Sequence, residues 1–228
     1  MSKKTIIILG IAVLIIAAIS AYFLYQKNST NSSLTPEKLL SSFKVQNSNL
    51  TAEQAGLFQQ RFNDVKKTLQ NSPDDFASWL YLGALKKGIN DYEGARDVFI
   101  YAGQIRPQAS TPFANLADLY AYFLNDPAKA EENIKKAITN DANDYNLYIS
   151  LADIYRYKFP DRQGMYEQTM LEAIAKFPDN ANVIAPLAGY FRDTNQTQKA
   201  INWYEKLVKL DSDNDSAKQD LAELKAKK

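Results

Sequence analysis

The sequence predicts an all-α protein, a right-handed α-solenoid of helical hairpins behind one N-terminal transmembrane helix. Three observations support this prediction: a pattern that returns every 34 to 36 residues, an uncharged apolar run near the N-terminus, and a small number of helix breakers. The 228 residues include 8 Gly and 8 Pro, and 46% are hydrophobic, which is typical of a helical globular chain. Repeats of this length are typical of stacked hairpins, each of which buries its apolar face against the next.

The composition excludes several kinds of chemistry. The chain has no His and no Cys, so thiolate catalysis, disulfides, zinc fingers and a serine-protease triad are all unavailable. The 27 Lys and Arg against 26 Asp and Glu give a net charge of +1, without the basic excess of a nucleic-acid-binding domain. We therefore expect a protein that is not an enzyme, with no metal, no cofactor and no nucleic acid partner.

Residues 5–25 form an apolar segment of 21 residues without a charge. At about 1.5 Å per residue, a helix of this length spans the roughly 30 Å hydrocarbon core of a bilayer. Lys3 and Lys4 precede the segment and only Lys27 follows closely. This asymmetry predicts a cytoplasmic N-terminus (residues 1–4) and a repeat domain outside the cytoplasm, with a bacterial envelope as the favoured location.

A cleaved signal peptide is the alternative interpretation of this segment, since Ala18-Ile19-Ser20 resembles the small-x-small pattern before a cleavage site. The apolar run, however, continues past that site from Tyr22 to Leu24. It is also longer than the ~7–15 residues of a typical signal-peptide core. These features favour an uncleaved anchor. A cytosol-facing receptor of an organelle outer membrane would have the same arrangement, and this topology stays open.

The next segment, residues 26–50, is rich in Ser and Asn and predicts a polar linker that holds the folded part away from the bilayer. Within it, Thr35 precedes a proline and could begin a short helix. Thr51 and Gln54 have the spacing of a capping box. An N-terminal capping helix is therefore expected over residues 51–72.

Four copies of the repeat can be aligned, and a C-terminal capping helix is expected after them, over residues 215–228. The copies cover 76–109, 110–144, 145–180 and 181–214, an array over 76–214. Their first helices contain L-A-D-L-Y from Leu116, L-A-D-I-Y from Leu151 and L-A-G-Y-F from Leu187. The tyrosines expected in the core as framework residues are Tyr120, Tyr148, Tyr155 and Tyr204.

In the first copy, W-L-Y-L-G from Trp79 is followed by Ala95, Phe99, Ala102 and Pro107. At this spacing the chain resembles the tetratricopeptide repeat (TPR) family. The resemblance extends over all four copies. It implies a solenoid of hairpins in which the first helix of each repeat lines a concave face, and it implies that this face binds a protein or peptide.

The resemblance assigns the candidate partner-binding residues to that concave face. They are Leu80, Lys87, Asp118, Tyr122, Asn146, Ile149, Asp153, Arg156, Tyr157, Asn182 and Arg192. Tyrosine and arginine often anchor interfaces. Tyr122 and Tyr157, together with the two arginines, therefore favour a peptide that is held by aromatic contacts and positioned by polar groups. Alternatively, the rings only cover neighbouring helices and the two aspartates pair with the arginines inside the array.

Two other functions fit these residues less well. Ala84 and Asp118 stand where TPR receptors of chaperone tails need asparagine-type and lysine-type residues, so we do not expect a chaperone-tail receptor. Asp118 and Asp153 are the residue types of a glycosidase acid pair, but the sequence suggests no further acid, no substrate cradle and no pocket that would raise a carboxyl pKa. We therefore expect a membrane-anchored adaptor or assembly scaffold, with a self-associating structural module as the alternative.

Overall fold

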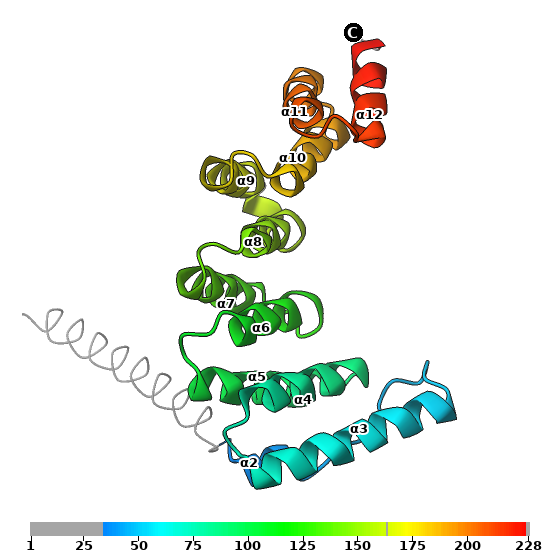
Figure 1. Cartoon of the computed structure of the whole chain (residues 1–228), viewed down its shortest axis with the longest axis vertical. Helices are drawn as coiled ribbons and strands as arrows, with labels where there is room; N and C mark the ends of the chain where they lie inside the picture. The colour runs from blue at the N-terminus through cyan, green and yellow to red at the C-terminus, as the bar shows by residue number, and fades with distance from the viewer. Residues whose placement is uncertain (1–33, 163, 227–228) are drawn as a thin grey trace, which may run out of the picture.

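The computed structural model describes residues 34–162 and 164–226. The segment predicted to cross the membrane, residues 5–25, lies outside these ranges, as does the first part of the predicted linker. Within the described ranges, no helix combines the length and the apolar character needed to cross a bilayer. The described helices form one elongated, curved stack (Figure 1).

The helices follow one another as hairpins. Their bounds are α2 (Pro36–Leu39), α3 (Ala52–Asn71), α4 (Phe76–Gly88), α5 (Tyr92–Ile105), α6 (Thr111–Tyr122), α7 (Pro127–Asn140), α8 (Tyr145–Lys158), α9 (Gly164–Lys176), α10 (Ala181–Asp193), α11 (Thr197–Leu210) and α12 (Asp215–Ala226). The hairpins pair α4 with α5, α6 with α7, α8 with α9 and α10 with α11, while α3 packs on α4 and α12 packs on α11. This order confirms the all-α class and the solenoid of hairpins.

Helix α3 begins at the expected capping box. The hydroxyl oxygen of Thr51 accepts from the N–H of Gln54 at 3.2 Å, and the side-chain oxygen of Gln54 accepts from the N–H of Thr51 at 2.9 Å. The two bonds satisfy backbone donors that the first turn of a helix leaves open. The predicted start of this helix is confirmed.

Turns with left-handed backbone join the helices of three hairpins. Asn90, Asn125 and Asn195 have φ of 65°, 51° and 57°, in a region that Asn enters more readily than most other residues with a side chain. Each lies one residue before the N-cap of a second helix. The third hairpin differs, because a short 3₁₀ helix, η1 (Pro160–Arg162), precedes α9.

Small residues let the two helices of a hairpin approach closely. A Cβ added to Gly83 would lie 2.4 Å from a ring carbon of Phe99, so a larger residue would displace that ring. On α5, Ala95 and Ala102 are fully buried. The framework tyrosines are buried as predicted: Tyr120, Tyr148, Tyr155 and Tyr204. Shared framework residues therefore build the core of every hairpin.

The described part of the predicted linker, residues 34–50, is packed against the repeats and does not act as a spacer. We call this segment the N-terminal strap. Leu39 and Leu40 are buried in the core formed with α3, α4 and α5. Phe43 stacks on Phe62 of α3 with 4.5 Å between ring centroids. These apolar residues anchor the strap, although Ser and Asn are frequent over residues 26–50 as a whole.

Polar contacts also fasten the strap to the first hairpin. The buried ammonium of Lys86 donates to the carbonyl of Ser42 at 3.1 Å and pairs with Asp91 at 2.8 Å. The N–H of Gln46 donates to the carbonyl of Ile89 at 3.0 Å. A buried cation must be paired, and these contacts satisfy Lys86. The strap is therefore part of the folded domain.

Candidate partner-binding groove

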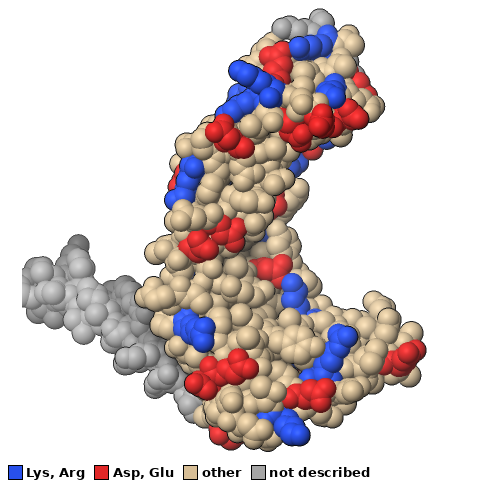
Figure 2. Space-filling view, viewed as in Figure 1, with Lys and Arg blue, Asp and Glu red and all other residues tan. Residues whose placement is uncertain are grey.

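The inner side of the curve carries the candidate site. The stack bends so that α6, α8 and α10 lie toward its hollow side, while α7 and α9 lie on the outer side (Figure 1). Acidic and basic side chains both gather in and around this hollow (Figure 2). The inner side of the stack therefore carries charges of both signs.

Two tyrosines of the groove are exposed, in contrast to the framework tyrosines. Tyr122, at the end of α6, is 46% exposed and Tyr157, near the end of α8, is 59% exposed. The ammonium of Lys158 lies 4.6 Å from the centre of the Tyr122 ring, a cation–π contact. The interpretation in which these rings only cover neighbouring helices does not account for this exposure.

Lys87 and Asp118 form an ion pair between the first two repeats. The ammonium of Lys87 also lies 4.9 Å from the centre of the Phe123 ring. Phe123 is 40% exposed and was missing from the predicted set. The preceding Tyr122, which the predicted set did contain, was the nearest signal for it in the sequence.

Asp153 occupies the position in α8 that Asp118 has in α6, but its surroundings differ. Within the described chain, the half-buried carboxylate of Asp153 has neither a hydrogen bond nor an ion pair. Burial raises the pKa of Asp153 above its ordinary value, and the charge of Arg156 opposes that rise. Burial also raises the pKa of Tyr122, with a further contribution from the Asp153 carboxylate.

A small cavity of about 90 Å³ lies beside Asp153, between the second and third repeats. Its lining residues are Ala114, Ala117, Asp118, Tyr122, Ile134, Ser150, Asp153 and Ile154. Two carboxylates and one exposed tyrosine therefore meet at one opening in the groove.

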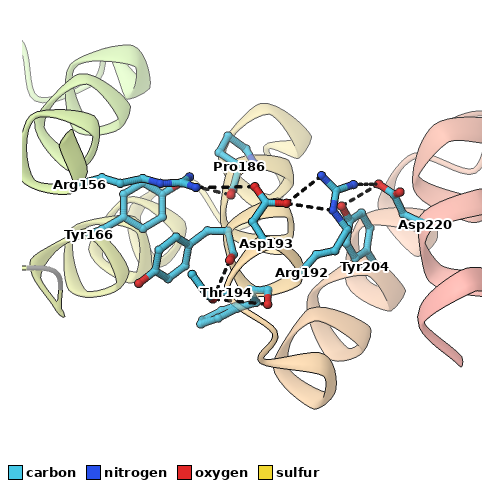
Figure 3. A network of polar contacts seen from close by, with 10 residues as sticks. Arg156, Tyr166, Pro186, Arg192, Asp193, Thr194, Tyr204 and Asp220 are labelled. Carbon is cyan, nitrogen blue, oxygen red and sulfur yellow. Dashed lines mark hydrogen bonds and ion pairs between the residues drawn. The ribbon is translucent and has the colours of Figure 1, made fainter. Parts of the chain in front are cut away.

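Arg156 joins the third repeat to the fourth. Its guanidinium lies 5.3, 5.4 and 5.2 Å from the ring centres of Tyr157, Tyr166 and Tyr190. It also pairs with Asp193 at 3.6 Å (Figure 3). A second cavity of about 220 Å³ is lined by Arg156, Tyr157, Tyr190 and Thr194. This cavity offers flat aromatic surface beside a cation.

The buried Tyr166 packs against Tyr190, one of the residues that line this cavity. Its hydroxyl donates to the carbonyl of Pro186 inside α10 at 3.2 Å (Figure 3). Burial raises the pKa of Tyr166 to about 12. The ring of Tyr166 lies 4.3 Å from that of Tyr190, so it helps to hold Tyr190 in the cavity wall.

Arg192 is held in an internal network at the C-terminal end of the groove. Its guanidinium donates to the carboxylate of Asp220 at 2.6 Å and pairs with Asp193 at 3.1 Å (Figure 3). The hydroxyl of Tyr204 donates to the same oxygen of Asp220 at 2.7 Å. The two arginines do pair inside the array, as the alternative held, but with Asp193 and Asp220 and not with the aspartates of α6 and α8.

The other candidate residues mostly serve the framework. Leu80 and Ile149 are partly buried and pack against the core. The side-chain amide of Asn146 donates to Asp144, the N-cap of α8, at 2.9 Å. That of Asn182 donates to the hydroxyl of Tyr145 at 3.3 Å. In the described chain, the polar candidate residues without a side-chain hydrogen bond or ion pair lie on α6 and α8: Tyr122, Asp153 and Tyr157.

This geometry defines an open solenoid of TPR-type hairpins with a charged and aromatic inner face. No protein-family model matches the sequence, and no curated protein matches it either. Within residues 34–162 and 164–226, no three acidic side chains lie close enough together to hold a metal ion.

Solved structures show the fold. YrrB, a TPR protein with an unusual peptide-binding site, is 12% identical with a TM-score of 0.51, covering 71% of this chain and 82% of YrrB. PilW, a widely conserved type IV pilus biogenesis factor, is 17% identical with a TM-score of 0.53, covering 74% and 85%. Yeast Tom70 is 21% identical with a TM-score of 0.56, covering 86% of this chain and 39% of Tom70. The chain therefore has the TPR fold.

Proposed function

We propose that this chain is a membrane-anchored adaptor or assembly scaffold that binds a protein or peptide in its concave groove. The observation that carries the proposal is the contrast among its tyrosines. Tyr122 and Tyr157 stand exposed one repeat apart in the groove, whereas the framework tyrosines are buried. Exposed tyrosines in a concave surface are frequent anchors of bound peptides, because each ring offers a large contact area with few rotatable bonds.

The chemistry of the groove supports binding over catalysis. Asp118 is ion-paired with Lys87, so the acids of α6 and α8 are not two free carboxyl groups facing one sugar ring. Glycosidases need one acid to give a proton and the other to act as base or nucleophile on the same bond. Aromatic surfaces beside small cavities fit the side chains of an extended peptide better.

The anchor and its location are part of the same proposal. Residues 5–25 are apolar over a length that matches a bilayer. The lysines before this segment favour a groove on the outer side of a bacterial cytoplasmic membrane. The similarity in fold to PilW, a pilus biogenesis factor, is consistent with a role in an envelope machine. Self-association through the groove and a cytosol-facing organelle receptor are the alternatives.

Site-specific photocrosslinking tests the binding face. A photoreactive residue is placed at Tyr157 in the full-length chain in cells, and the crosslinked products are identified by mass spectrometry. The matched control position is Leu171, which is 40% exposed on α9 at the outer side of the stack. A different protein crosslinked from Tyr157 but not from Leu171 supports the adaptor. Recovery of this chain alone supports self-association, and equal products from both positions reject the groove.

Protease accessibility tests the topology independently. After the outer layers of intact cells are removed, added protease should digest the repeat domain. Protection of that domain until the membrane is permeabilised would place it in the cytoplasm and contradict the envelope location. This outcome would leave peptide binding by the groove unaffected.

A further inference from the structure

We infer that the cavity between α6 and α8 selects a Lys or Arg side chain of the bound peptide, with Asp153 as its counter-ion. The inference rests on the proposed function, because it names the chemistry of the partner in the same groove. It starts from a difference between two neighbouring repeats.

The first two repeats have different residues at one equivalent position of their first helices. Lys87 lies five residues after Leu82, and Ala121 lies five residues after Leu116, so they occupy the same place in successive first helices. Lys87 of α4 pairs with Asp118 of α6, the first helix of the next repeat. A lysine at position 121 could form the equivalent ion pair with Asp153, but this position holds an uncharged alanine. Asp153 therefore lacks the internal cation that its counterpart in α6 has.

The remaining cations near Asp153 are engaged elsewhere. Arg156 lies against three aromatic rings and pairs with Asp193. Lys158 lies over the ring of Tyr122. Of the five charged residues predicted for the groove, Asp153 is the one without an ion pair in the described chain. A half-buried carboxylate in this state is unfavourable, and a cation from outside would stabilise it.

The shape of the cavity fits the end of a side chain. Its volume of about 90 Å³ is well below the ~300–1,000 Å³ of pockets for small molecules. Ala114, Ala117 and Ser150 leave the space open, and Ile134 and Ile154 provide apolar surface along which an alkyl stem can lie. An acidic side chain would meet repulsion from the unpaired carboxylate of Asp153. An ammonium or guanidinium would meet attraction and hydrogen-bond acceptors.

Peptide selection tests the inference on the full-length chain. A phage-displayed library of random dodecapeptides is selected on the wild type, on Asp153→Asn, and on Glu172→Gln as a matched loss of one exposed carboxylate on α9. We expect Lys or Arg to be enriched at one aligned position with the wild type and with Glu172→Gln. With Asp153→Asn, peptides should still be selected but without that enrichment.

The outcomes separate this inference from the function on which it rests. Peptides selected by the wild type without a basic position, or with one that persists in Asp153→Asn, would overturn the cation site and leave peptide binding intact. Failure to select any peptide would reject the proposed function and this inference together. Circular dichroism of each variant establishes that it is folded.

A selected peptide then gives the quantitative test. Replacing its basic residue by norleucine keeps an alkyl stem and removes the charge. Isothermal titration should show about a tenfold loss of affinity for the wild type and little change for Asp153→Asn. Equal losses for the two proteins would mean that the peptide charge is not recognised by Asp153.

Discussion

Helices α6 and α8 contain almost the same sequence, L-A-D-L-Y and L-A-D-I-Y, yet their aspartates differ in their contacts. Asp118 is neutralised by Lys87 from the preceding repeat, whereas Asp153 follows a repeat with Ala121 at that place. The motif decides where a carboxylate lies, and the neighbouring repeat decides whether it has an ion-pair partner. The buried framework and the ion pairs of the inner face are therefore encoded at separate positions of each repeat.

The largest expected effect concerns the framework that the two helices share. Leu116→Ala and Leu151→Ala each remove a buried side chain, and each should lower the free energy of unfolding by about 2–5 kcal/mol. Denaturant unfolding followed by circular dichroism measures both values. A cost near zero for either variant would mean that the two motifs are not equivalent in the core.

A smaller effect is expected from a variant in which Asp118 loses its ion pair and so resembles Asp153. Lys87→Ala removes the ion pair of Asp118 and leaves its carboxylate without a counter-ion. We expect affinity for a peptide with a second basic residue, spaced to reach α6, to rise about tenfold, because a charge-assisted hydrogen bond is gained. Titration of peptides with one and two basic residues measures the change. An unchanged ratio would show that pairing by Lys87 does not control recognition at Asp118.

The last tyrosine of each motif gives a third comparison. The hydroxyl of Tyr155 donates a hydrogen bond to Glu131 at 2.8 Å. In the described chain, the hydroxyl of Tyr120 makes no hydrogen bond. Tyr155→Phe should therefore destabilise the protein by about 1 kcal/mol, with Tyr120→Phe close to neutral. Thermal unfolding of the two variants provides the measurement. Equal changes would remove this distinction between the hairpins.

The smallest effect is the pH dependence contributed by Asp153. Burial raises its folded-state pKa above the ordinary value of 3.8, so the folded state binds this proton more tightly than the unfolded state does. The resulting stabilisation is complete below the unfolded pKa and is lost as the pH rises through the folded pKa. The stability of Asp153→Asn relative to the wild type should therefore increase with pH from about 3.8 upward. Urea unfolding across this range measures it, and a constant difference would contradict the burial of this charge.

The sequence predicted the features that every repeat shares. It did not predict the features that depend on contacts between neighbouring repeats. Spacing predicted the hairpins and the exposed tyrosines at positions 122 and 157 as groove residues. The free carboxylate of Asp153 depends on residues in three helices, so the repeat pattern alone could not distinguish it from Asp118. The strap was misread because composition averaged over residues 26–50 concealed Leu39, Leu40 and Phe43.

The packed strap sets a limit on how far the domain can stand from a membrane. With an anchor at residues 5–25, only the eight residues 26–33 would connect the bilayer to the first described residue. At about 3.3–3.6 Å per residue, this connection reaches at most roughly 29 Å even when fully extended. The N-terminal end of the groove would then work within a short tether of the lipid surface, where it would meet membrane-associated partners before freely diffusing ones.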